Sequence, residues 1–215
     1  MHPSDQPPTA VLVAPHPDDE VFGAGALLRW LVACRHRVRV IAVTDGEAAW
    51  GDLAAGDRQD LARRRAAERA RALTLLGVGG HIEVVRLGIP DGAVADHEDE
   101  LTDRLAEIGA PLMAATWRND GHPDHEAVGR AAAVAAGRLD ASLVDFVVWA
   151  GLRQRLTSRQ LRTARIVPMS AATRAAKLRA AAAFRSQLEP SPDGRPVVPQ
   201  ALIDRLAVQP EVVLT

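Results

Sequence analysis

The feature that most constrains this chain is a regular alternation between short apolar runs and longer segments with helical periodicity. The apolar runs fall at 11–14, 38–43, 82–87, 111–116 and 143–149, and the helical segments fall between them at 20–34, 58–76, 96–108 and 125–138. Strands separated by helices predict a mainly parallel sheet, because parallel neighbours need crossover connections. The predicted fold is therefore an α/β/α three-layer sandwich with helices on both faces of the sheet.

The C-terminal part of the chain is less regular. A short strand is predicted near Ile166 and a helix over 171–188. The stretch 190–215 holds five of the fourteen prolines, which predicts an irregular wrap with one short helix and an edge strand at 212–214. A length of 215 residues without a clear linker predicts one domain spanning 1–215.

Composition excludes several classes of function. The chain sets 26 Lys and Arg against 27 Asp and Glu, and nucleic-acid binding usually requires a strongly basic surface. We therefore expect no nucleic-acid partner. The apolar runs are strand-length, which predicts no membrane span, and the single Cys34 is typical of a reducing compartment. A soluble cytoplasmic protein is expected, and homo-oligomerisation is compatible with the sequence.

The first polar motif, Pro-His-Pro-Asp-Asp-Glu at 15–20, follows the first predicted strand directly. Open α/β sheets bind ligands at the carboxyl ends of their strands. His16 and Asp19 can converge on one cation there, because imidazole nitrogen and carboxylate oxygen are normal zinc ligands, and this leaves Asp18 free. The alternative is a polar helix start with acidic residues near the positive end of the helix dipole, which leaves His16 unexplained.

A second motif, Asn-Asp-Gly-His-Pro-Asp-His-Glu at 119–126, follows the predicted strand 111–116. Its two histidines can supply a third metal ligand and leave one coordination position for water, as a catalytic zinc site requires. Alone, the motif could be a capped helix start with surface histidines. Two such clusters at strand ends favour a metal site.

The stretches PHPDDEVFGAGALL and GHPDHEAVGRA resemble the two signature motifs of the PIG-L/LmbE-like N-acetylglucosaminyl deacetylase family. VTDGEAAW, LGIPDG and KLRAAAAFRSQ resemble further stretches of that family in the same order. The resemblance implies a Rossmann-like sheet and a zinc-dependent hydrolase that removes an N-acetyl or longer N-acyl group from an amino sugar or glycoconjugate. Fe²⁺ or another divalent cation is an alternative metal. It also implies a small amino-sugar substrate. The alternatives are a metal-dependent amidase acting on a non-sugar amide and a non-catalytic metal-containing binding protein.

Transferred residue by residue, the resemblance assigns the metal ligands to His16, Asp19 and His125, the general base to Asp18, the electrophilic partner to His122 and the orientation of that partner to Asp124. A protonated His122 would stabilise the oxyanion and later protonate the amine, and a carboxylate at Asp124 would raise its pKa. The chain has no tyrosine, so any hydroxyl assistance that relatives use must be missing or replaced.

Two residues are candidates for substrate contact. In the family an arginine at the position of Arg65 is associated with polar groups of the substrate, but five arginines between 63 and 71 could equally form a solvated face. Asp91 lies in a Pro-Asp-Gly turn, where a turn-forming role competes with contact to a sugar hydroxyl.

Overall fold

The fold is described from a computed structural model that covers residues 9–150 and 157–215. Within these residues a seven-stranded sheet has the order β3-β2-β1-β4-β5-β7-β6. Its strands are β1 Ala10–Ala14, β2 Val38–Ala42, β3 Ile82–Arg86, β4 Leu112–Thr116, β5 Ser142–Phe146, β6 Ala164–Ile166 and β7 Val212–Leu214. The neighbours from β3 to β5 pair in parallel, whereas β7 pairs antiparallel with both β5 and β6. The predicted mainly parallel α/β fold is confirmed. Part of the irregular region predicted after 149 lies outside the described residues.

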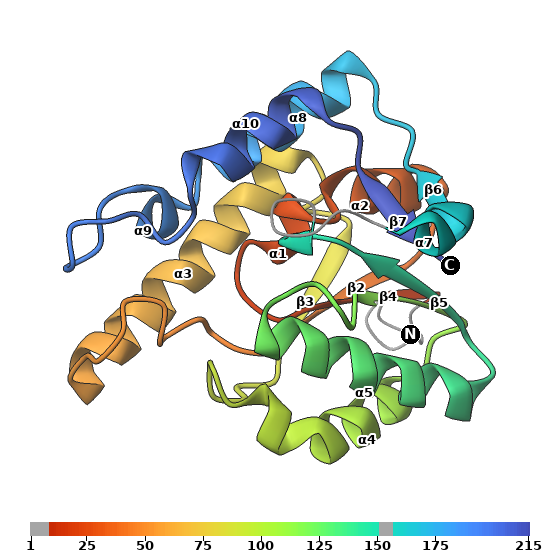
Figure 1. The fold of residues 1–215 in the computed structure, drawn as a ribbon, viewed down its shortest axis with the longest axis horizontal. Coiled ribbons are helices and arrows are strands. Elements are labelled where there is room, and N and C mark those ends of the chain that lie inside the picture. The colour runs from red at the N-terminus through yellow and green to blue at the C-terminus, as the bar shows by residue number, and fades with distance from the viewer. Residues whose placement is uncertain (1–8, 151–156) are drawn as a thin grey trace.

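Helices cover both faces of the sheet (Figure 1). One face is covered by α1 Asp19–Phe22, α2 Gly25–Ala33, α3 Ala55–Leu76, α8 Ala171–Ala181 and α10 Gln200–Val208, and the other by α4 Glu98–Ile108 and α5 Pro123–Leu139. Shorter elements are the 3₁₀ helix η2 Val94–His97, α7 Ser158–Thr163 and α9 Arg185–Leu188. No helix in the described part of the chain is long and apolar enough to cross a membrane.

Strand β1 lies in the interior of the sheet and is buried along its whole length. Alternate residues point to opposite faces, so that Leu12 packs on the α2 side and Val13 on the α5 side. Leu12 is paired with Val40 on β2 and with Ala114 on β4. The turn that follows β1 therefore emerges in the middle of the carboxyl edge of the sheet.

The helix predicted over 20–34 is broken into α1 and α2. A Cβ at Gly23 would lie 2.5 Å from the Phe146 ring of β5, so the backbone can approach that strand only where no side chain stands. The helix predicted over 171–188 is broken as well, because α8 ends at Ala181 and α9 begins at Arg185. Both breaks depend on tertiary packing that helical periodicity does not encode.

The last strand does not lie where the sequence predicts it. The edge position expected for 212–214 is wrong, because β7 lies between β5 and β6, and β6 is the edge strand at that end of the described sheet. Glu211, just before β7, accepts the backbone N–H groups of Ala26 and Leu27 at 2.8 Å and pairs with Lys177 at 2.5 Å. This buried contact ties the C-terminal segment to the start of α2.

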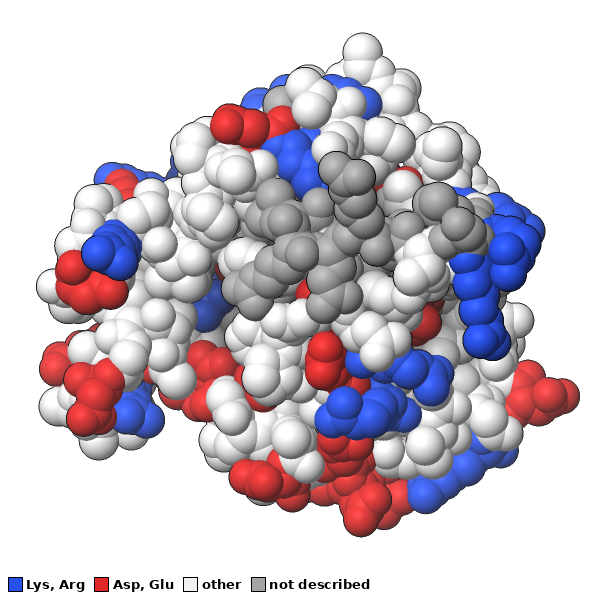
Figure 2. Space-filling model, in the orientation of Figure 1, with Lys and Arg blue, Asp and Glu red and all other residues white. Residues whose placement is uncertain are grey.

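The surface view shows basic and acidic side chains interspersed on one face of the molecule (Figure 2). Acidic side chains gather at the lower edge of this view, over α4, with basic side chains beside them. Arg130 of α5, for example, pairs with Glu98 at the start of α4.

Candidate functional site

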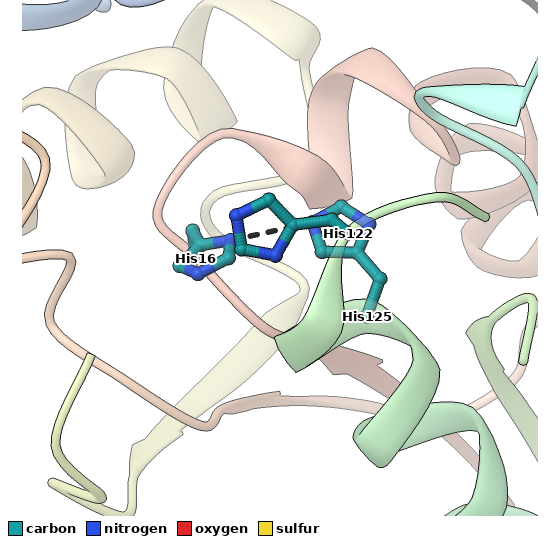
Figure 3. A group of neighbouring side chains, drawn as sticks. All are labelled: His16, His122 and His125. Atoms are coloured by element: carbon teal, nitrogen blue, oxygen red, sulfur yellow. Dashed lines mark hydrogen bonds between the residues drawn. The ribbon is translucent and has the colours of Figure 1, made fainter. Parts of the chain in front are cut away.

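The two polar motifs meet at the carboxyl edge of the sheet. The first lies in the turn after β1, the second leads from β4 into α5, and β1 and β4 are neighbours. His16 is thereby grouped with two histidines that lie more than a hundred positions later: its ring centre lies 4.9 Å from that of His122 and 5.3 Å from that of His125 (Figure 3). The parallel topology alone produces this convergence.

Three donor atoms form a compact triangle. Nδ1 of His16 lies 3.2 Å from Oδ2 of Asp19, Nε2 of His125 lies 3.2 Å from the same oxygen, and the two nitrogens are 3.3 Å apart. In a tetrahedral zinc site with ligand bonds near 2.0–2.1 Å, two ligand atoms are separated by about 3.3 Å. The triangle therefore has the dimensions that a small divalent cation requires.

The other nitrogen of His16 has different partners. Nε2 lies 3.1 Å from Oδ2 of Asp124 and 3.1 Å from Oδ1 of Asp91. Carboxylates that accept this N–H leave Nδ1 as the free ligand nitrogen, which is how metal-ligating histidines are usually oriented. Burial opposes protonation of His16, but Asp124, Asp19 and Asp91 raise its pKa well above the usual value.

Other combinations of these side chains could also hold a metal ion. His16, His122 and His125 form one group and His16, Asp91 and Asp124 another, each with its donor atoms within 4.8 Å of one another. In the triangle that includes Asp19 all three edges are 3.2–3.3 Å, and it leaves the second nitrogen of His16 for Asp91 and Asp124. We therefore regard it as the better candidate for a metal centre.

Asp120 orients His125 from the side opposite the triangle. Its Oδ2 lies 2.8 Å from Nδ1 of His125, and its carboxylate also accepts the backbone N–H groups of Val148, Trp149 and Ala150. Burial opposes protonation of His125, but Asp19 and Asp120 raise its pKa to about 9. No role for Asp120 is predicted from the sequence. Its role could have been inferred from chemistry, because a metal-ligating histidine almost always donates its second N–H to a carboxylate or carbonyl.

The charge balance of the site also fits a cation. Five carboxylates gather around the histidines and Arg65, namely Asp18, Asp19, Asp91, Asp120 and Asp124, and most of them are buried. Within this low-dielectric region protons on His16 and His125 offset part of the negative charge. A divalent cation bound at the triangle would displace those protons and supply the same compensation.

Asp18 lies beside the triangle and belongs to a different network. The residue is 6% exposed, and its carboxylate accepts a hydrogen bond from Arg65 at 3.2 Å. Burial raises the pKa of Asp18 to about 7, although the Arg65 cation opposes this. A carboxylate with such a pKa is suited to exchanging protons near neutral pH.

Arg65 is buried in the site and does not belong to the solvated face of α3. It is 2% exposed and donates to the carbonyl oxygens of Gly46 at 2.8 Å and Pro17 at 3.0 Å, in addition to Asp18. Gly46 has a φ of 69°, and a Cβ there would lie 2.1 Å from the guanidinium. Both the positive φ and the close guanidinium therefore require glycine at position 46.

The contact between His122 and Asp124 differs from the one predicted, in which the Asp124 carboxylate orients the His122 ring. The Asp124 carboxylate accepts from His16 and from the backbone of Gly92 and Val94, and it is the backbone N–H of Asp124 that donates to Nδ1 of His122 at 3.2 Å. Burial and the cationic His16 and His125 lower the pKa of His122 to about 4. The ring is therefore neutral, its Nδ1 caps α5, and its proton resides on Nε2.

A pocket opens beside these groups. Its polar lining is His16, Asp18, Asp19, Arg65, Asp91, His122 and Gln187, and its apolar lining is Phe22, Ala49, Val148, Trp149, Val197 and Val198. Every sequence-predicted site residue lines this pocket except His125 and Asp124, which are buried behind it. A small molecule can therefore reach Asp18 and His122 together.

Comparison with known proteins gives a consistent result. The sequence profile of PIG-L, described as GlcNAc-PI de-N-acetylase, matches residues 11–136. The chain is 32% identical over 173 residues to the 1D-myo-inositol 2-acetamido-2-deoxy-alpha-D-glucopyranoside deacetylase of Kineococcus radiotolerans, an alignment that covers 62% of this chain and 47% of that protein. The chain thus spans about half the length of this curated relative.

Two solved structures share the fold. A conserved protein of Thermus thermophilus is 22% identical, with a TM-score of 0.70 over 97% of this chain and 94% of the other. The N,N'-diacetylchitobiose deacetylase of Pyrococcus horikoshii is 20% identical, with a TM-score of 0.63 over 92% of this chain and 74% of the other.

Proposed function

The chain belongs to the PIG-L family, and from this premise we propose that it is a metal-dependent hydrolase that removes an N-acetyl group from an amino sugar or glycoconjugate. The observation that carries the proposal is the triangle of His16, Asp19 and His125 beside the buried carboxylate of Asp18. Family membership supports the reaction type, and the pocket beside Asp18 supports access by a small molecule.

The triangle is proposed to hold Zn²⁺, through two imidazole nitrogens and one carboxylate oxygen. Such a mixed nitrogen and oxygen set with room for water is typical of catalytic zinc, although Fe²⁺ also accepts two histidines and one carboxylate. When bound there, the cation would polarise the amide carbonyl and lower the pKa of water from about 15.7 towards about 7. Asp120 on one side and Asp91 with Asp124 on the other hold the two imidazoles in the tautomers that this binding requires.

Asp18 is the proposed general base. Its carboxylate takes a proton from water as the water oxygen forms a bond to the carbonyl carbon. The carbon–nitrogen bond then breaks, and Asp18 returns the proton to the departing nitrogen, giving a free amine and a carboxylic acid, which releases its remaining proton to solvent. A pKa near 7 makes both transfers accessible at neutral pH.

His122 is the proposed donor to the developing oxyanion. Because Nδ1 accepts the backbone N–H of Asp124, the ring can donate through Nε2 while it stays neutral. This differs from the protonated histidine expected from sequence, and it leaves the proton needed by the amine to Asp18. A neutral donor of this kind contributes about 10²–10³-fold in rate in other acyl-transfer sites.

The amino-sugar substrate is proposed from family membership and from the curated relative, whose name specifies a 2-acetamido-2-deoxy-glucopyranoside. In this chain, Phe22, Val148 and Val198 give the pocket an apolar wall that suits the methyl group of an acetamide. Asp91 and Gln187 line the pocket with polar groups that suit hydrogen bonds to sugar hydroxyls.

The test combines metal analysis with acetate release. Purified protein should contain about one equivalent of divalent metal and release acetate from a panel of N-acetylglucosaminides with differing aglycones. Asp18→Ala should keep the metal and lose at least about 10³-fold in kcat, because the base is removed and the ligands remain. Turnover of simple non-sugar acetamides alone would indicate an amidase. Metal without turnover of either class would indicate a binding protein.

A further inference from the structure

Helix α3 carries two arginines on its inner face. Its buried residues are Leu61, Arg65, Arg69, Ala72, Leu73 and Leu76, which is the stripe expected to be apolar in a helix packed on a core. Arg65 faces Asp18 at 3.2 Å, and one turn later Arg69 faces Glu20 at 3.4 Å. Burying such pairs contributes little net stability, because desolvation offsets their attraction. The Arg69–Glu20 pair therefore calls for an explanation beyond folding.

Glu20 connects this pair to the proposed base. Its side chain is fully buried, and its Oε2 accepts the backbone N–H of Asp18 at 3.2 Å while Oε1 faces Arg69. Within the described residues the guanidinium of Arg69 makes no hydrogen bond, and it is 2% exposed. Glu20 is thus the acidic side chain that faces the Arg69 guanidinium in this buried region.

The backbone of Asp18 needs such support. Its φ is 146° and its ψ is −28°, a conformation that residues with a side chain rarely adopt. Strained conformations persist only where the surroundings hold them from several sides. Here Glu20 holds the N–H, Arg65 holds the carboxylate, and the N–H groups of Val21 and Phe22 hold the carbonyl oxygen.

We propose that Glu20 and Arg69 form a positioning pair that fixes the strained backbone of Asp18 and thereby aims its carboxylate into the pocket. The inference rests on the proposed function, because it takes Asp18 as the base. Without the Arg69 guanidinium facing it at 3.4 Å, the buried Glu20 side chain would turn away. The Asp18 N–H would then lose its acceptor, and the backbone would relax away from the productive geometry. Neither residue touches the substrate pocket.

The competing explanation is that the pair only stabilises the fold, and the chain offers a matched control. Lys177 and Glu211 form a second ion pair that is 3% and 5% exposed and lies at the start of α2, away from Asp18. Lys177→Met removes a buried cation in the same way as Arg69→Met. Both variants should lower the melting temperature, but only Arg69→Met should alter catalysis.

The experiment measures kcat, KM and bound zinc for Arg69→Met, Glu20→Gln, the double variant and Lys177→Met. Arg69→Met should lower kcat about 10–100-fold with KM within about twofold and zinc content unchanged, because a small displacement of a reacting group is costly. Glu20→Gln keeps an oxygen for the Asp18 N–H and should lose less. The double variant should recover part of the kcat lost in Arg69→Met, since no buried carboxylate is left without a counter-ion.

Three results would overturn the positioning role: kcat of Arg69→Met within about twofold of wild type, a loss confined to KM, or an equal loss of kcat in Lys177→Met. A crystal structure of Arg69→Met gives a readout that does not depend on turnover. Asp18 should leave the positive φ region there, and retention of its wild-type backbone would contradict the proposal. If the wild-type protein shows no deacetylation, the proposed function is refuted. The crystal structure of Arg69→Met still tests the positioning role in that case, because it does not depend on turnover.

Discussion

Asp120→Asn is the substitution that most sharply tests how the site prepares His125. In the wild type, Oδ1 of Asp120 accepts the N–H groups of Val148 and Ala150, whereas Oδ2 accepts from Trp149 and from Nδ1 of His125. An asparagine retains one oxygen. If that oxygen accepts the N–H groups of Val148 and Ala150, the NH₂ group of the asparagine faces the Trp149 N–H and Nδ1 of His125. Nδ1 can accept a hydrogen bond from this NH₂ group only if the proton of the neutral His125 ring moves to Nε2.

The magnitude follows from that exchange. Zinc binding at Nε2 of His125 would then require the ring proton on Nδ1, where it faces the NH₂ group, so zinc affinity should fall about 10–100-fold, as for loss of other such orienting partners. This corresponds to about 1.4–2.7 kcal/mol of binding free energy. The Trp149 N–H also loses this acceptor, which should lower the free energy of unfolding by about 1–3 kcal/mol.

Zinc dissociation constants from competition with a chelator give the measurement, and chemical denaturation gives the stability. Asp145→Asn is the matched control, because it neutralises a half-buried aspartate on β5 that has no contact with the histidines in the described structure. It should leave zinc affinity unchanged. An Asp120→Asn protein that binds zinc within about threefold of wild type would refute the orienting role of Asp120.

Two further outcomes follow from the same structure. Zinc binding at about pH 7.5 should release about two protons, measured by calorimetry in buffers of different ionisation enthalpy, because both ligand histidines are protonated without metal. For the same reason the free energy of unfolding of the metal-free protein should fall as pH rises from about 6.5 through about 9. A histidine whose pKa is raised in the folded state stabilises that state only while it stays protonated. A free energy of unfolding that does not change over this pH range would contradict the prediction. Gly23→Ala should destabilise by about 1–3 kcal/mol through overlap with Phe146, whereas Gly137→Ala in α5, where a Cβ meets nothing within 4 Å, should be neutral or stabilising.

Periodicity predicted the regular elements well wherever they pack along their whole length. The short apolar run at 11–14 correctly predicted a strand, and in the structure Val11 and Val13 of β1 face one layer and Leu12 the other. The break at Gly23 was not predictable, because it depends on a ring from β5 more than a hundred positions away. The interior position of β7 has the same origin, since its partners β5 and β6 are chosen by topology.

The candidate site was likewise predictable only in part. The two motifs and their convergence could be predicted, because strand ends of a parallel sheet share an edge. The partners of the motif residues could not. Adjacent positions suggested that the Asp124 carboxylate serves His122, but the fold turns it towards His16. Arg65 was indistinguishable from its exposed neighbours in sequence, and only the packing of α3 on the first motif buries it.

The central claim is that His16, Asp19 and His125 share one divalent cation. Anomalous diffraction at the zinc absorption edge, from crystals grown with zinc, tests it most directly. The predicted result is one peak at about 2.0–2.2 Å from Nδ1 of His16, Oδ2 of Asp19 and Nε2 of His125. A peak bound instead by Nε2 of His16 with Asp91 and Asp124, or a zinc-free site in which the three side chains point apart, would contradict it.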